Sequence, residues 1–179
     1  TQIAGLNTDD LTALTTAQYA TISSAQAAAF TTDQIAALES ADLRALSSAA
    51  IRGWNTDQLG ALSSDNMAAL TTGQVAALTT TQVSSLVSDD LNALGTAQFA
   101  ALTTAQVASL TASQISTLES SDLRALSTAQ FAALSTAQAA ALTTDQMPTL
   151  ESADLRALSS RAVRAPPAAR VRAAAYPAL

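Results

Sequence analysis

An eight-residue repeat runs through most of the chain without an insertion or a deletion. From Asn7 the sequence divides into nineteen octads, the last of which ends at Leu158, and a degraded twentieth octad follows. The consensus is Ser/Thr, Ser/Thr, any residue, Gln/Asp, apolar, any residue, Ala/Ser/Thr and Leu, and we number these positions 1 to 8. A fixed short period of this kind predicts stacked units, each of which contacts mainly its neighbours.

Neither a strand nor one long helix accommodates this period. A strand needs apolar and polar residues in alternation, and the octads, rich in Ala and Gln, do not alternate in this way. In a continuous helix eight residues turn through about 800°, which is about 80° more than two full turns. The Leu residues at position 8 would therefore travel around the helix, and no single face could be buried. Each octad is expected to end one helix and begin another.

The residues of the octad contain a helix start signal. Ser or Thr at position 1 can act as the N-cap of a capping box whose partner is the Gln or Asp at position 4. The preceding Leu and the apolar residue at position 5 are placed to form a hydrophobic staple. We therefore predict one helix of about six residues in each octad. Because such a helix is unstable alone, the octads must stack, with Leu110, Leu118, Leu126 and Leu134 buried and Thr104 and Gln106 near the surface.

A second, longer spacing is superimposed on the eight-residue repeat. Asp followed by Leu recurs every 32 residues at Asp90, Asp122 and Asp154, and Phe99 and Phe131 at position 5 are also 32 residues apart. This spacing predicts an all-α solenoid with about four octads per coil. Phe99 is then expected beside Phe131, and Asp122 beside Asp154. A coil of two octads, with a 16-residue repeat, is the alternative.

Two parts of the chain depart from the pattern. Residues 1–158 are expected to form the octad-repeat solenoid, and the basic, Ala- and Pro-rich residues 159–179 to form a cap or a linker, of which a cap is favoured because repeat arrays need atypical ends. Pro148 lies inside a predicted helix and removes one hydrogen bond. Unusual octads around Gly53 and Trp54 predict a local irregularity.

The composition argues against an enzyme. The chain contains no Cys, no His and no Lys, so the usual nucleophiles, general bases and soft metal ligands are missing. All 14 acidic residues lie between Asp9 and Asp154, and capping and the helix dipole explain the Asp residues at position 4 without calcium. We therefore expect no catalytic residue, no cofactor-binding residue and no metal ligand. An acidic body also disfavours nucleic acid, and no apolar run is long enough to span a membrane.

The remaining polar and aromatic residues have structural interpretations. Glu39, Glu119 and Glu151, with Arg44, Arg124 and Arg156 in the same octads, predict ion pairs between coils. Aromatic residues at position 5 are expected in the core. The paired hydroxyl residues at positions 1 and 2 leave a second hypothesis open, a regular hydroxyl surface that binds ice or glycans. The region of Trp54 is distinctive enough to suggest a third, a protein-interaction solenoid.

Octads such as "ALTTAQV" at residues 101–107 resemble the short Ala/Thr/Gln-rich repeats of very long bacterial secreted or surface proteins. The resemblance covers residues 1–158. It implies an extracellular or cell-surface location and a role as a spacer, an adhesin stalk or a filament-forming segment. The expected partners are further copies that associate end to end, or other surface proteins.

Overall fold

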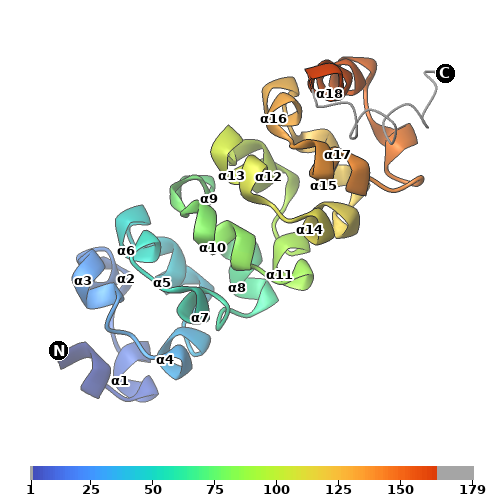
Figure 1. The fold of residues 1–179 in the computed structure, drawn as a ribbon. Coiled ribbons are helices and arrows are strands. Elements are labelled where there is room, and N and C mark those ends of the chain that lie inside the picture. The colour runs from blue at the N-terminus through green and yellow to red at the C-terminus, as the bar shows by residue number, and fades with distance from the viewer. Residues whose placement is uncertain (1, 165–179) are drawn as a thin grey trace.

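A computed structural model describes residues 2–164, which form short helices and no strand (Figure 1). The prediction of an all-α solenoid with one short helix per octad is confirmed. The elements are η1 (Gln2–Gly5), α1 (Thr8–Thr12), α2 (Thr16–Tyr19), α3 (Ser24–Ala27), α4 (Thr32–Ala36), α5 (Ser40–Ala45), α6 (Ser48–Arg52), α7 (Thr56–Leu59), α8 (Ser64–Ala69), α9 (Thr72–Ala77), α10 (Thr80–Ser85), α11 (Ser88–Asn92), α12 (Thr96–Ala101), α13 (Thr104–Ser109), α14 (Ala112–Thr117), α15 (Ser120–Ala125), α16 (Thr128–Ala133), α17 (Thr136–Ala141), η2 (Met147–Thr149) and α18 (Ser152–Arg164).

Each helix begins at the predicted N-cap. Thr103 has extended backbone angles, and its Oγ1 accepts a hydrogen bond from the Gln106 N–H at 3.2 Å. In return Gln106 Oε1 accepts from the Thr103 N–H at 2.7 Å. This reciprocal pair satisfies two backbone donors that a helix start otherwise leaves unpaired. The same capping box starts the helices that follow Asn7, Thr15, Ser23, Thr31, Asn55, Thr71, Thr79, Thr111, Ser127 and Ser135.

Ten helices of the described chain, α5, α8–α10 and α12–α17, end at the Leu of position 8, whereas α1–α4, α6, α7 and α11 end one or two residues earlier. Leu110, for example, has φ −56° and ψ 140°, outside the helical region, and its N–H donates to the Val107 carbonyl at 3.3 Å. Positions 8 and 1 together form a two-residue extended junction that turns the chain. Because the next capping box follows at once, no octad helix before α18 exceeds six residues within the described part of the chain.

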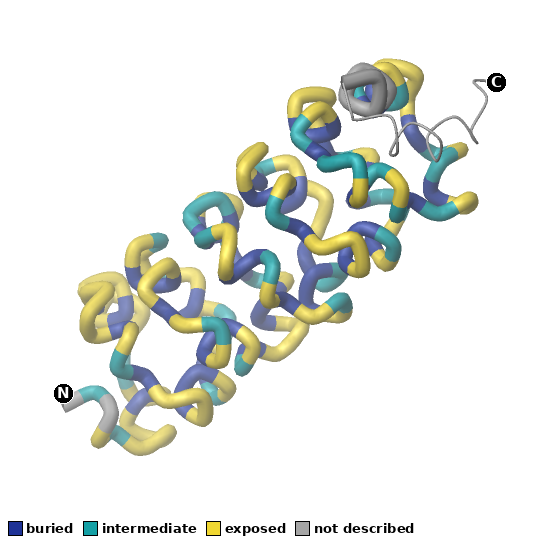
Figure 2. The backbone as a smooth tube through the Cα atoms, viewed as in Figure 1, coloured by how far each residue is buried: buried dark blue, intermediate teal, exposed yellow. Residues whose placement is uncertain are grey.

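The core consists of the side chains at positions 5 and 8. Leu110, Leu118, Leu126 and Leu134 are between 1 and 4% exposed, as predicted. Tyr19, Phe99 and Phe131 at position 5 are also buried, which confirms their assignment to the core. Figure 2 shows buried segments along the inside of the whole rod, so one continuous core joins all coils.

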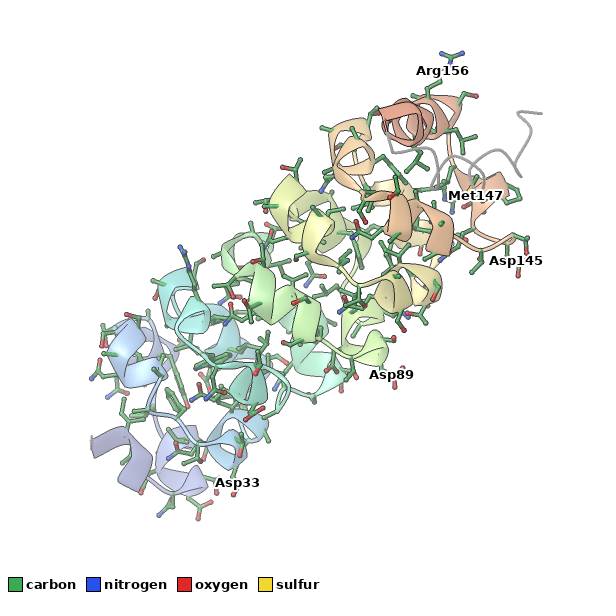
Figure 3. The ribbon with its side chains drawn as sticks, in the orientation of Figure 1. Asp33, Asp89, Asp145, Met147 and Arg156 are labelled. Carbon is green, nitrogen blue, oxygen red and sulfur yellow. The ribbon has the colours of Figure 1, made fainter. Side chains whose placement is uncertain are left out.

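The helices of neighbouring coils are three to four octads apart. Each helix packs against the helix three octads later, so that α12, which carries Phe99, packs against α9 and α15, whereas α16, which carries Phe131, packs against α13. Hydrogen bonds between coils span 25 to 31 residues. Asp33, Asp89 and Asp145 are seven octads apart and project from the same side of the rod (Figure 3). A coil therefore contains about three and a half octads, in agreement with the predicted coil of about four octads, and the two-octad alternative is wrong.

The junction between octads has a nearly constant geometry in the middle of the rod. The backbone angles of the junction residue are nearly the same at Leu102, Leu110 and Leu118. Coil length therefore follows from a constant turn per octad. The Asp and Phe residues that recur every 32 residues change which side chains lie between the coils, but this spacing is not equal to the length of one coil.

The C-terminal octads deviate most. Pro148 prevents an α-helix in its octad, which forms the 3₁₀-helix η2 instead, although the Thr143–Gln146 capping pair is kept. The helix α18 then runs without a break through Leu158 to Arg164. Residues 165–179, which make up most of the predicted cap, lie outside the described residues.

Candidate functional site

The most unusual polar feature is a row of buried amides between the coils. Gln106 is only 2% exposed, so the prediction that it lies near the surface is wrong, whereas Thr104 is exposed as predicted. A buried amide requires hydrogen-bond partners for its oxygen and for its nitrogen. The capping box occupies the oxygen only, which leaves the nitrogen to be explained.

The nitrogen of Gln106 binds the coil before it. Its Nε2 donates to the Val75 carbonyl and to the Leu78 carbonyl, both at 2.8 Å. These carbonyls belong to the C-terminal end of α9, where the last four carbonyls of a helix lack partners inside the helix. One side chain thus starts its own helix and completes the end of a helix 28 to 31 residues earlier.

The same contact recurs along the rod, and we call the set the glutamine ladder. In each case Nε2 donates to the position 8 carbonyl 28 residues earlier, at 2.6 to 2.8 Å. Asn66 makes a shorter version of the contact, since its Nδ2 donates to the Leu38 carbonyl at 2.7 Å. The ladder consists of Gln34, Gln58, Gln74, Gln82, Gln98, Gln106, Gln114, Gln130, Gln138 and Gln146.

Aspartates interrupt the ladder at position 4. Asp42, Asp90, Asp122 and Asp154 are buried at the same place in their octads but, when ionised, have no hydrogen to donate to a carbonyl. Burial raises the pKa of Asp122 to about 6, and the neighbouring Glu119 adds to the effect. Burial also raises the pKa of Asp42 and of Asp90. Asp154 instead accepts a hydrogen bond from Thr128 Oγ1 at 3.1 Å.

The charged residues form neither a metal centre nor the expected ion pairs. Within residues 2–164 no group of three or more acidic side chains could hold a metal ion, and the expectation of a metal-free protein stays a prediction. Arg44 and Arg124 are exposed, and no ion pair joins either of them to a carboxylate in the described structure. The predicted ion pairs are therefore wrong for these two residues, because an exposed pair gains too little to hold two long side chains together.

The region of Trp54 is part of the core. Trp54 is buried, and its Nε1 donates to the Ala27 carbonyl at 3.0 Å. A Cβ on Gly53 would lie 3.1 Å from the Ser24 carbonyl oxygen, so glycine permits close approach of α6 to α3. The local irregularity predicted here is thus a tight contact between coils. The Trp54 side chain is not displayed to a partner.

Some of the second hydroxyl residues also join coils. Ser40 Oγ donates to Asn66 Oδ1 at 2.7 Å, and Thr117 Oγ1 donates to Ser88 Oγ at 3.0 Å. Ser40 and Ser88 occupy position 2, which capping does not explain. These contacts give some position 2 hydroxyls a structural role that needs no ligand.

Tyr19 is the one aromatic residue of the core whose hydroxyl group binds a backbone carbonyl in the described part of the chain. Its Oη donates to the Leu11 carbonyl at 3.0 Å, and burial raises its pKa to about 12. The hydroxyl therefore stays protonated and acts as a hydrogen-bond donor at neutral pH.

In the described residues no helix is both long enough and apolar enough to cross a membrane.

Comparison with protein families gives one result. The model of the ALTTAQ repeat family matches residues 3–38, 35–72, 83–120 and 115–150. These matches span most of the octads, and they include eight of the ten members of the glutamine ladder, all except Gln74 and Gln82. Comparison with the curated proteins and with the solved structures gave no significant match.

Proposed function

The chain belongs to the ALTTAQ repeat family. We propose that it is a non-catalytic structural repeat protein that acts as a spacer of defined length. In this proposal it serves as an extracellular spacer, an adhesin stalk or a filament-forming segment of a bacterial surface. The resemblance of its octads to repeats of bacterial secreted and surface proteins supports that location.

The observation that carries the proposal is the glutamine ladder. It couples each coil to the coil before it through buried hydrogen bonds, and buried bonds are protected from competition with water. The coils follow one another along a single rod, with α1 and α18 at opposite ends (Figure 1). Repetition of the octad therefore directly increases the length of the rod.

The polar chemistry of the chain supports a structural role. The amide groups of the ladder are engaged with the backbone on both sides, so they have little capacity left for a substrate. The chain has no His, Cys or Lys to act as a general base or nucleophile. Polar groups that repeat along a rod also differ from the single converging cluster that catalysis requires.

Distances between spin labels test whether the chain is a rod. Because the chain has no Cys, labels can be placed at A17C with A97C and at A17C with A137C, all at exposed position 3 residues. The pairs are ten and fifteen octads apart. A rod predicts narrow distance distributions whose means stand in a ratio of about 1.5. Pulsed electron resonance at low protein concentration measures both distributions.

A flexible chain gives a different result. Its mean distance grows with about the square root of length, so the ratio would fall to about 1.2 with broad distributions. That outcome would contradict the spacer proposal. The same pairs measured in denaturant provide the flexible reference for each label position.

A further inference from the structure

The side chains at position 3 divide the rod into two different sides. Position 3 is exposed in every octad except that of Ser121, which is half-buried. In some octads this residue is Asp, and in the others it is Ala, Gly, Ser or Thr. The Asp residues do not alternate regularly along the sequence, yet Asp33, Asp89 and Asp145 project from the same side of the rod in Figure 3. The complete set at position 3 is Asp9, Asp33, Asp57, Asp65, Asp89 and Asp145.

The helices that carry these Asp residues lie together, and we call their outer surface the acidic side. α1 packs against α4, α4 packs against α7, and α8 packs against α11. Asn66 of α8 donates to the Leu38 carbonyl at the end of the α4 octad, and this contact joins the two groups. The octads of α1, α4, α7, α8 and α11 contain Asp residues but no Arg. The acidic side therefore carries charge of one sign over several coils.

A second group of stacked helices almost lacks charge, and we call its outer surface the uncharged side. It consists of α3, α6, α9, α10, α13 and α16, of which α6 packs against α3 and α9, and α13 packs against α10 and α16. Gln82 of α10 donates to the Trp54 carbonyl of the α6 octad and joins the two groups. Arg52 is the one charged residue in these octads. Figure 1 shows α3, α6, α9, α13 and α16 along one edge of the rod, and α1, α4, α8, α11 and α14 along the opposite edge.

The lack of charge on this side is not required by the fold. Position 3 lies in the first turn of each helix, where the helix dipole favours Asp on either side of the rod. Soluble surfaces usually mix charged residues of both signs, whereas the cores of protein interfaces are depleted of them. Thr72 and Thr104 are exposed on the uncharged side and make no side-chain hydrogen bond in the described structure, so their hydroxyl groups are available to a partner. The uncharged side thus has the composition of an interaction surface.

The charge and the shape of the chain indicate a second copy as the partner. Two copies repel each other through their acidic sides, so they can approach closely only through their uncharged sides. A second rod also repeats its coils at the same spacing. Each coil can therefore meet a coil of the partner, and many weak contacts act together. A compact partner would contact only a few of these coils.

We propose that two copies of this chain associate side by side through their uncharged sides, with both acidic sides facing solvent. The same surface serves both copies, so the contact is isologous and closes at a pair. This inference goes beyond the proposed function, because a single rod is sufficient as a spacer, whereas a pair is thicker and resists bending more strongly.

The variants A105D and S113D test this contact as a matched pair. Both residues are exposed at position 3, but Ala105 lies in α13 of the uncharged side, whereas α14 with Ser113 packs against α11 of the acidic side. Ser113 also follows Asp57 by seven octads, as Asp89 follows Asp33. Because Asp occurs naturally at position 3, neither change should disturb the helix, and circular dichroism checks that both variants are folded.

We expect the wild-type chain to form dimers as its concentration rises from about 10 μM to about 1 mM. The dissociation constant should be at least tenfold larger for A105D, because the new charges are buried in the contact, and should change less than about threefold for S113D. Sedimentation velocity measures these constants. X-ray scattering should show that the dimer has nearly the same maximum dimension as the monomer, since the rods lie side by side.

Three results would overturn the inference. They are a wild-type chain that stays monomeric up to about 1 mM, equal weakening by A105D and S113D, and a dimer with about twice the maximum dimension of the monomer, which would indicate contact through the ends. The spin-label distances are measured at low concentration, where the chain is monomeric. They therefore test the spacer independently of this association.

Discussion

At the scale of the residue, the position 4 amide carries two functions in one planar group. Its oxygen starts a helix, and its nitrogen completes the end of a helix in the previous coil, as Gln106 does for Thr103 and Leu78. Glutamate would serve the first function equally well but has no N–H for the second. The chain has no glutamate at position 4 in any of its nineteen octads. That exclusion is the signal in the sequence that could have revealed the ladder.

Asp122 shows what the loss of the donor costs. Its pKa is raised to about 6 by burial and then by Glu119, above the ordinary value of 3.8. The folded chain therefore binds this proton more tightly than the unfolded chain does. The stability that Asp122 contributes is present at low pH and is lost as pH rises through about 6. The protonated carboxyl can donate to a carbonyl, and the ionised carboxylate cannot.

The substitution D122N predicts a gain that depends on pH. Asparagine at this site is expected to donate to the Leu94 carbonyl, as Asn66 donates to the Leu38 carbonyl. We expect the free energy of unfolding to rise by about 1 kcal/mol at pH 8, and the difference from wild type to shrink below pH 5. Denaturant titrations at both pH values measure it. D145N, at an exposed residue, controls for the loss of one negative charge; a D122N gain of equal size at both pH values would contradict the explanation.

At the scale of the element, the sequence predicts helix starts well because their cause is local. The capping box involves residues three apart, so Thr103 and Gln106 indicate it without knowledge of the fold. Burial at position 4 could not be predicted by the same reasoning, because it depends on a carbonyl 28 residues away. The degraded twentieth octad has Ala162 at position 4 and therefore lacks the capping box, in agreement with the continuation of α18 through Ser159.

A pair of threonine substitutions tests the local cause of the helix starts. Thr103 accepts from the Gln106 N–H at 3.2 Å, whereas the adjacent Thr104 is exposed and makes no side-chain hydrogen bond in the described structure. We expect T103A to lower the free energy of unfolding by about 1 kcal/mol and T104A to change it by less than about 0.5 kcal/mol. Thermal and urea unfolding measure both. Equal losses in the two variants would mean that capping does not define the octad.

At the scale of the whole molecule, the sequence predicts the coil length only approximately, as about four octads where the structure has about three and a half. The 32-residue spacing of Phe99 and Phe131 suggests a coil, but the junction Leu has nearly the same backbone angles in octads with Phe, Val or Ile at position 5. The turn is a property of the two-residue junction, and its sum over several octads decides which helices meet. Small errors in the predicted turn add up over several octads. Local rules therefore predict the helix of one octad more reliably than which helices pack together.

The stacking of helices that are three octads apart predicts which helices a destabilising core substitution affects. Ile115 is fully buried in α14, which packs against α11 and α17. I115A should cost about 2 to 5 kcal/mol, and contacts in a solenoid are limited to neighbours. Native-state hydrogen exchange should therefore speed up in α11 and α17 more than in α10. V107A, one octad earlier in α13, should shift the pattern to α10 and α16. An effect of I115A centred on α10 and η2 would instead support four octads per coil, and uniform acceleration along the rod would show one cooperative unit.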